Sequence, residues 1–130
     1  MIDIFSLKVE EIASKIKDAQ LTSVEVCEKY IEKINKFEKD LKAWVHFDKK
    51  LLLEKAAEAD KYRQSGKPMG PLHGIPIAVK DIVGTVDMPT ECGTVIRKGK
   101  SYSQNAEIID LLLAAGAIAV SYTHLRAHET

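Results

Sequence analysis

A twelve-residue stretch limits what this chain can fold into more than any other feature. Residues 70–81 read GPLHGIPIAVKD, so a loop rich in glycine and proline passes into an apolar run that ends in a lysine and an aspartate. The apolar run at residues 75–79 predicts a short strand. Pro76 has no backbone N–H to donate, which restricts it to the end or the edge of a strand. The stretch therefore predicts a loop, a strand and a polar strand end that carries Lys80.

Four helices and three strands are predicted from the spacing of apolar residues and from capping residues. The helices are expected at residues 8–17 after Ser6 as N-cap, from Thr22 with a capping box to Glu25, from Asp48 to near Gly66, and from Asn105 as N-cap to Gly116. The strands are expected at residues 43–47, 75–79 and 117–120. A helix followed within one glycine by an apolar run is the usual joint of a layered sheet, so the predicted fold class is α/β.

The second predicted helix carries the clearest apolar stripe. Its apolar residues recur every three to four positions, as on one face of a helix, and two aromatic side chains widen the face: Val24, Cys27, Tyr30, Ile31, Ile34 and Phe37. We expect this face to be buried in the core.

Lys80 stands where the predicted strand leaves the core, and Asp81 follows it. Active sites of layered α/β folds often lie at strand ends. A partly buried amine binds its proton less tightly, because burial disfavours the charged form, and a neutral amine can act as a general base. Alternatively, Lys80 is exposed to solvent at the end of the strand and forms an ion pair with an acidic residue. The residues alone leave both interpretations open.

Three ordered blocks of the chain resemble the amidase signature family. Residues 70–81 are similar to the segment that carries the lysine of that family. Residues 87–94, which read DMPTECGT, resemble the next block, where a Pro-Thr pair leads to a glycine followed by serine or threonine. Residues 105–107 and 111–120 resemble a helix that ends in Ala-Gly-Ala and the strand after it. The resemblance covers residues 7–120 and implies an α/β fold with a mixed sheet flanked by helices.

The resemblance also implies hydrolysis of a carboxylic amide through an acyl-serine intermediate. In that family, the lysine matching Lys80 takes a proton through a cis-serine, a second serine attacks the amide carbonyl, and water completes the hydrolysis. Backbone N–H groups of a loop rich in glycine and serine hold the oxyanion. The resemblance thus assigns Lys80 the catalytic role of general base and a small-molecule amide as substrate. It implies no cofactor.

The chain departs from the family pattern in its catalytic serines. Both serines belong to a Gly-Ser-rich block that follows the strand predicted at residues 117–120, and the 130 residues contain no Gly-Ser-Ser-Gly run. We therefore expect residues 1–120 to be the N-terminal part of an amidase domain that is truncated and inactive by itself.

The last ten residues break the family pattern. The polar run at residues 121–130 replaces a Gly-Lys-Thr type of turn, and we expect it to be a non-native or disordered tail. Its histidines, His124 and His128, are four residues apart, as in helical metal sites, but a third ligand is missing from the nearby sequence. We expect no metal site.

Charge and composition argue against several classes of protein. Nineteen basic residues balance nineteen acidic ones, whereas nucleic-acid-binding proteins usually carry a basic excess. The apolar runs are too short to span a bilayer, and the first residues lack the features of a secretory signal. We therefore expect a cytoplasmic protein that binds neither nucleic acid nor membrane, with Cys27 and Cys92 as reduced thiols. A structural or solvated role is expected for His73, and the oligomeric state is left open.

Two alternatives to a general amidase remain. The A subunit of the glutamyl-tRNA amidotransferase, which releases ammonia from glutamine, belongs to the same family. That subunit usually shows a Thr-Thr-Cys type of sequence at this place, whereas residues 87–91, which read DMPTE, look more like the general amidases, and on this ground we favour the general amidases. The second alternative is a non-catalytic α/β module that binds a partner through its helices.

Overall fold

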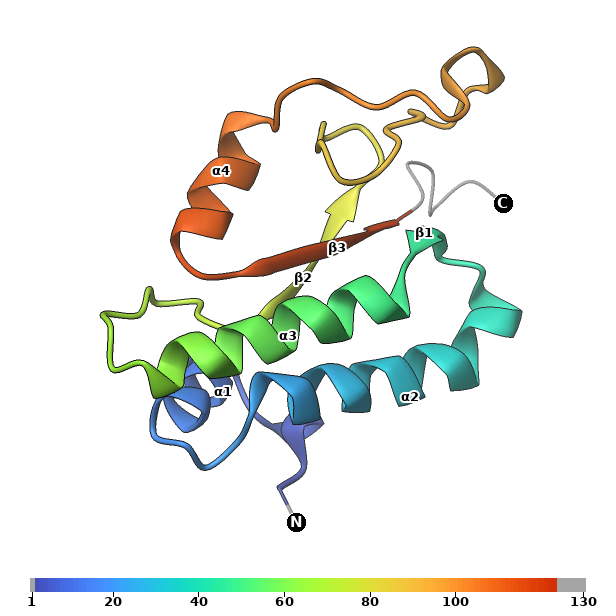
Figure 1. The fold of residues 1–130 in the computed structure, drawn as a ribbon. Helices are drawn as coiled ribbons and strands as arrows, with labels where there is room; N and C mark the ends of the chain where they lie inside the picture. Colours follow the sequence, from blue (N-terminus) through green and yellow to red (C-terminus); the bar gives the residue numbers. More distant parts are fainter. Residues whose placement is uncertain (1, 124–130) are drawn as a thin grey trace.

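The computed structural model describes residues 2–123 and shows a mixed three-stranded sheet packed between helices (Figure 1). The elements, in chain order, are the 3-10 helix η1 (Ile4–Ser6), α1 (Val9–Lys17), α2 (Ser23–Leu41), β1 (Trp44–Phe47), α3 (Lys49–Gln64), β2 (Pro76–Lys80), the 3-10 helix η2 (Val95–Arg97), α4 (Glu107–Ala114) and β3 (Ile118–Thr123). The predicted α/β class and mixed sheet are confirmed.

The central strand of the sheet is β3, and the strand order is β1-β3-β2. β2 pairs with β3 in parallel, after a crossover that contains α4, whereas β1 pairs with β3 in the antiparallel direction. Lys80 lies opposite Thr123 in the first pairing, and Trp44 lies opposite Thr123 in the second. The carboxyl ends of β2 and β3 therefore meet the amino end of β1 at one edge of the sheet.

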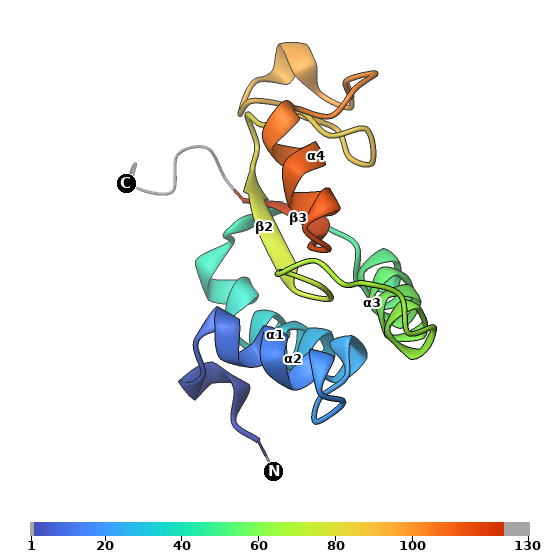
Figure 2. The same ribbon diagram turned by 90° about the vertical axis from the view of Figure 1, so that its left-hand side faces the viewer.

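Helices cover both faces of the sheet. Successive residues of β3 point to opposite sides, so neighbouring apolar residues of this strand pack against different helices. Ile118 packs against Cys27, Leu52 and Ala56 of α2 and α3. Ala119 packs on the other side, with Val79, Met88 and Ile109, and Ile109 belongs to α4. A third buried cluster joins η1 and α1 to α2 and to the start of β2, and Figure 2 shows α1 and α2 side by side below that strand: Ile4, Ile12, Ile16, Leu21, Val26 and Ile75.

The predicted N-cap Thr22 and the predicted start of the third helix after Asp48 are confirmed. Thr22 Oγ1 accepts the backbone N–H of Glu25 at 3.0 Å, and Glu25 Oε2 accepts the backbone N–H of Thr22 at 2.7 Å, which completes the predicted capping box. The Asp48 carboxylate accepts the backbone N–H of Leu51 at 2.9 Å. In both cases the cap and its partner are three residues apart, so the local sequence is enough to identify them.

The other two predicted N-caps, Ser6 and Asn105, are wrong. Lys8 is the N-cap of α1, while Ser6 ends η1 and donates its hydroxyl to the carbonyl of Asp3. Ala106 is the N-cap of α4, because the Asn105 side chain is engaged elsewhere. Its Oδ1 accepts the backbone N–H of Val86, nineteen residues away, at 2.9 Å. A more distant segment thus takes over a side chain that could have capped the helix.

The apolar stripe of α2 is buried in only its first half. Cys27 is fully buried, whereas Phe37 is 42% exposed. The second half of the stripe lines an open cavity of about 490 Å³ between α2, β1 and β2, whose apolar lining includes Ile34, Phe37, Leu41, Trp44 and Phe47. The prediction that the whole face is buried is therefore wrong for the last two turns.

The end of β3 lies beyond the predicted strand. The strand continues to Thr123, so three residues of the predicted tail pair with β1 and β2. The remaining tail, with His124 and His128, lies outside the described residues. Within residues 2–123, no helix combines the length and the apolar character that crossing a bilayer would require.

The loop before β2 lies against the joint between α4 and β3. The backbone N–H of Leu72 donates to the carbonyl of Ala115 at 2.9 Å, and that of Gly74 donates to the carbonyl of Gly116 at 3.0 Å. A Cβ atom on Gly116 would lie 2.7 Å from the Cα atom of His73. The backbones of the two segments are thus in direct contact. Glycine is required at position 116 because a Cβ atom would have no room there and because its φ is +93°.

Gly116→Ala should therefore destabilise the chain more than Gly66→Ala does. Both glycines follow the C-cap of a helix at positive φ, but a Cβ on Gly66 would meet no atom within 4 Å. We expect a loss of about 1 kcal/mol in the free energy of unfolding for Gly66→Ala, from backbone strain, and of about 3 kcal/mol for Gly116→Ala, from strain plus overpacking. Urea unfolding of both variants measures the difference. Equal losses would show that the close approach of the two segments is unimportant.

Candidate active site

Lys80 is the last residue of β2 and is exposed at the edge where the strands β2 and β3 end. Its backbone is held on one side by the pairing with Thr123. On the other side its carbonyl accepts two N–H groups, from Ile82 at 2.8 Å and from Val83 at 3.0 Å. The backbone that carries the amine is therefore fixed by a strand and by the tight turn that follows it. The sequence predicts that Lys80 is partly buried. In the structure it is exposed, so residues 2–119, for which exposure is described, do not bury it.

Asp81 connects this turn to the next block of the chain. Its side chain is buried, with the residue only 1% exposed, and Oδ1 accepts the backbone N–H of Glu91 at 2.9 Å. Asp81 is therefore turned into the protein and holds residue 91 beside the end of β2. The first two of the three blocks that carry the family resemblance, residues 70–81 and 87–94, are in direct contact through this bond.

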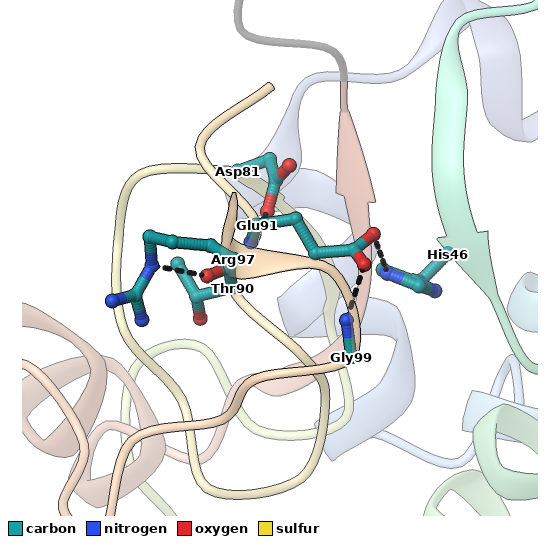
Figure 3. Close-up of polar contacts among 6 residues, drawn as sticks. All are labelled: His46, Asp81, Thr90, Glu91, Arg97 and Gly99. Atoms are coloured by element: carbon teal, nitrogen blue, oxygen red, sulfur yellow. Dashed lines mark hydrogen bonds and ion pairs between the residues drawn. The ribbon is translucent and has the colours of Figure 1, made fainter. Parts of the chain in front are cut away.

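The Glu91 side chain extends the connection to β1, as Figure 3 shows. Its Oε1 lies 2.9 Å from Nε2 of His46, and its Oε2 accepts the backbone N–H of Gly99 at 2.6 Å. The bond from Gly99, together with the contact to His46, lowers the pKa of the Glu91 carboxyl below its ordinary value. Glu91 is thus ionised at neutral pH and joins three separate segments.

The segment between Glu91 and α4 is folded onto itself. Thr90 is fully buried, its backbone N–H donates to the carbonyl of Lys100 at 2.8 Å, and its carbonyl accepts Nε of Arg97 at 3.0 Å. The Arg97 guanidinium lies 4.7 Å from the centre of the Tyr102 ring. Thr94 caps η2 by accepting the backbone N–H of Ile96 at 3.1 Å. Arg97 thus has a structural role in this segment.

His73 lies at the opposite end of β2 from Lys80. Its Nε2 is 2.8 Å from the carbonyl oxygen of Ala59, and its ring stacks at 5.5 Å on Tyr62, so its contacts are with α3. Ser23 holds the same loop from α2, because its hydroxyl donates to the carbonyl of Gly74 at 2.6 Å. These contacts fit the structural role expected for His73.

The two cysteines differ in their surroundings. Cys27 is fully buried among α2, α3 and β3, and this burial raises the pKa of its thiol to about 12, so it is an unreactive core residue. Cys92 is half-buried in the segment after β2, with a φ of +56°. Neither cysteine forms a disulfide within residues 2–123. The same part of the chain holds no cluster of three or more side chains suited to a metal ion.

Comparison with known proteins agrees with this geometry. A family model described as Amidase matches residues 25–128. Curated relatives include the A subunit of glutamyl-tRNA(Gln) amidotransferase from Chloroflexus aurantiacus, 37% identical over 120 residues, and the protein of the same name from Streptomyces coelicolor, 34% identical over 125 residues. These matches cover 92% and 96% of this chain and 25% of each relative, so the chain spans about a quarter of the length of the curated relatives it matches.

Solved structures of other amidases share the fold. Fatty acid amide hydrolase superposes with a TM-score of 0.86 at 29% identity, covering 92% of this chain and 21% of that one. The native peptide amidase from Stenotrophomonas maltophilia superposes with a TM-score of 0.83 at 26% identity, covering 92% of this chain and 25% of that one. The likeness therefore extends over nearly the whole chain.

Proposed function

Because the chain belongs to the amidase family, we propose that Lys80 is the general base in the hydrolysis of a carboxylic amide through an acyl-serine intermediate. One observation carries the proposal. Lys80 ends a strand at the edge of the sheet, exposed and with its backbone fixed, in the segment that resembles the lysine segment of the family. A base must approach the proton that it removes, and an amine presented in this way meets that requirement.

The proposed reaction begins with a neutral Lys80 amine. The amine takes a proton from a serine hydroxyl, through the cis-serine, and the serine oxygen bonds to the amide carbon. When the C–N bond breaks, the proton passes to the leaving amine, and water then releases the acid from the acyl-enzyme. Lys80 supplies the base, while the two serines and the oxyanion donors are assigned to further segments of a complete amidase, since the chain spans about a quarter of its relatives.

The described chain does not enclose Lys80. Lys80 is exposed here, and burial is what weakens the hold of an amine on its proton. We therefore assign its burial to the same further segments. It follows that the chain by itself should lack both the nucleophile and the enclosed surroundings that a catalytic amine needs.

We infer a small-molecule amide as the substrate and keep the general amidases as the favoured branch. The solved neighbours fatty acid amide hydrolase and peptide amidase support this choice, as does the similarity of residues 87–91 to the general amidases. The curated relatives, which are named as the A subunit of glutamyl-tRNA(Gln) amidotransferase, support the alternative, hydrolysis of glutamine. Both branches use Lys80 in the same way. A cytoplasmic location remains a prediction.

Two preparations test the proposed function. The 130-residue chain should release no amine from aryl amides above a Lys80→Ala control. A longer protein that joins this chain to the remaining segments of an amidase should hydrolyse them and form an acyl-enzyme detectable by mass spectrometry. Faster hydrolysis of glutamine than of aryl amides would favour the amidotransferase branch. Absence of hydrolysis of any amide by a folded, complete protein would favour the non-catalytic module.

A further inference from the structure

Glu91 occupies an unusual place, because it joins both outer strands of the sheet. It follows β2 in the chain, and its side chain reaches His46 on β1 (Figure 3). Since the strand order is β1-β3-β2, this contact passes over the end of the central strand β3. His46 lies opposite Tyr122 in the register, one residue from the pair formed by Lys80 and Thr123. The contact is therefore made at the same sheet edge as the proposed base.

The backbone of Glu91 is tied to the residue that follows Lys80. Its N–H donates to the buried carboxylate of Asp81, and Asp81 belongs to the turn whose N–H groups bind the Lys80 carbonyl. A continuous set of hydrogen bonds thus runs from His46 through Glu91 and Asp81 to the strand end. The Glu91 carboxylate also accepts the N–H of Gly99, and this bond holds the two ends of the loop 91–99 together.

We propose that Glu91 is a positioning residue for Lys80: it fixes the turn after β2 against β1 and so sets where the amine is presented. This inference rests on the proposed function. Glu91 acts through Asp81 and the turn and does not itself touch the reacting atoms. The sequence block 87–94 then has a structural reason to accompany the lysine segment, because the backbone of residue 91 holds the end of that segment.

A solvated surface acid would look different. The Glu91 side chain is only 17% exposed and that of His46 is 32% exposed, whereas the surface pair of Lys50 and Glu54 is 87% and 56% exposed and 3.7 Å apart. The Glu91 carboxyl also has a lowered pKa, with the Gly99 N–H as the first cause. Surface pairs contribute little, so Glu54 offers a matched control for the loss of a glutamate.

The first experiment measures amide hydrogen exchange in the 130-residue chain. In Glu91→Ala, the backbone N–H groups of Gly99, Ile82 and Val83 should exchange at least about tenfold faster than in the wild type, because local opening becomes easier. Glu54→Ala should leave all three rates unchanged. Glu91→Gln keeps an oxygen for the Gly99 N–H and an amide for the His46 ring, and should retain most of the protection. Unchanged rates in Glu91→Ala would overturn the proposal, whatever the activity.

The second experiment measures hydrolysis in a complete amidase that contains this chain. Glu91→Ala should lower kcat at least about tenfold with little change in KM, since small displacements of a catalytic group slow the chemical step. Glu91→Gln should restore most of kcat. A kcat that stays at the wild-type value while exchange accelerates would overturn the positioning role. A wild-type protein without activity would contradict the proposed function, and the exchange rates would still decide whether Glu91 fixes the strand end.

Discussion

Replacing Asp60 with alanine is expected to lower the free energy of unfolding by about 4 kcal/mol, because it leaves one buried and one partly buried N–H group without an acceptor. Asp60 lies on α3 and is 8% exposed. Its Oδ1 accepts the backbone N–H of Ser23 at 2.7 Å, and its Oδ2 accepts that of Val24 at 3.1 Å. These are the first two residues of α2, where a helix has N–H groups that no carbonyl of its own can satisfy. A carboxylate is also favoured there by the helix dipole.

The neighbouring groups leave no replacement acceptor at this helix end. Thr22 Oγ1 already accepts the backbone N–H of Glu25, and the Glu25 carboxylate already accepts the backbone N–H of Thr22. The Ser23 hydroxyl donates to Gly74 in the loop before β2. Asp60→Ala should therefore loosen both the contact of α2 with α3 and the loop that leads to Lys80.

Urea unfolding followed by circular dichroism measures the effect. A lower urea midpoint reports a loss of stability if the dependence of the unfolding free energy on urea concentration is unchanged. An unchanged slope means that unfolding exposes the same amount of surface in both proteins. Asp40→Ala is the matched control, since Asp40 is an exposed aspartate on α2 and its loss should cost less than about 0.5 kcal/mol. Equal effects of the two variants would mean that Asp60 does not hold the end of α2.

The features that the sequence predicts well are those whose partners are close in the chain. The capping box between Thr22 and Glu25 spans three residues, as does the cap from Asp48 to Leu51, and both are found as expected. The strand before Lys80 is displaced by only one residue from its predicted range. These features depend on periodicity and local hydrogen bonding, which a short segment determines by itself.

The features that the sequence did not reveal have distant partners. Asp60 binds residues that precede it by 37 and 36 positions, and Glu91 meets a histidine 45 positions away. The only sequence signal for His46 is a polar side chain inside a short apolar strand, which does not identify a partner. The local pattern also fails at two places. Asn105 accepts a distant backbone N–H instead of capping α4, and the last turns of α2 line an open cavity instead of packing into the core.

The Lys80→Met variant of a complete amidase that contains this chain should lose at least about a thousandfold in kcat/KM, within the range that general base catalysis supplies. Methionine has a similar length but cannot accept a proton. Because Lys80 is exposed and β2 is held by its pairing with β3, the substitution should leave the fold intact, and the unfolding midpoint of the 130-residue chain should change little. The loss should appear mainly in kcat, since a base acts in the transition state.

The measurement that tests the central claim most directly is kcat/KM for Lys80→Arg in that complete protein, set against Lys61→Met as control. Arginine keeps the positive charge and the length but does not release its proton at ordinary pH, so it cannot serve as a base. Lys61 is an exposed lysine in the last turn of α3. We predict that Lys80→Arg is as inactive as Lys80→Met and that Lys61→Met keeps wild-type activity. If Lys80→Arg retained most of the activity, the lysine would contribute its charge alone, and the assignment of Lys80 as the general base would be wrong.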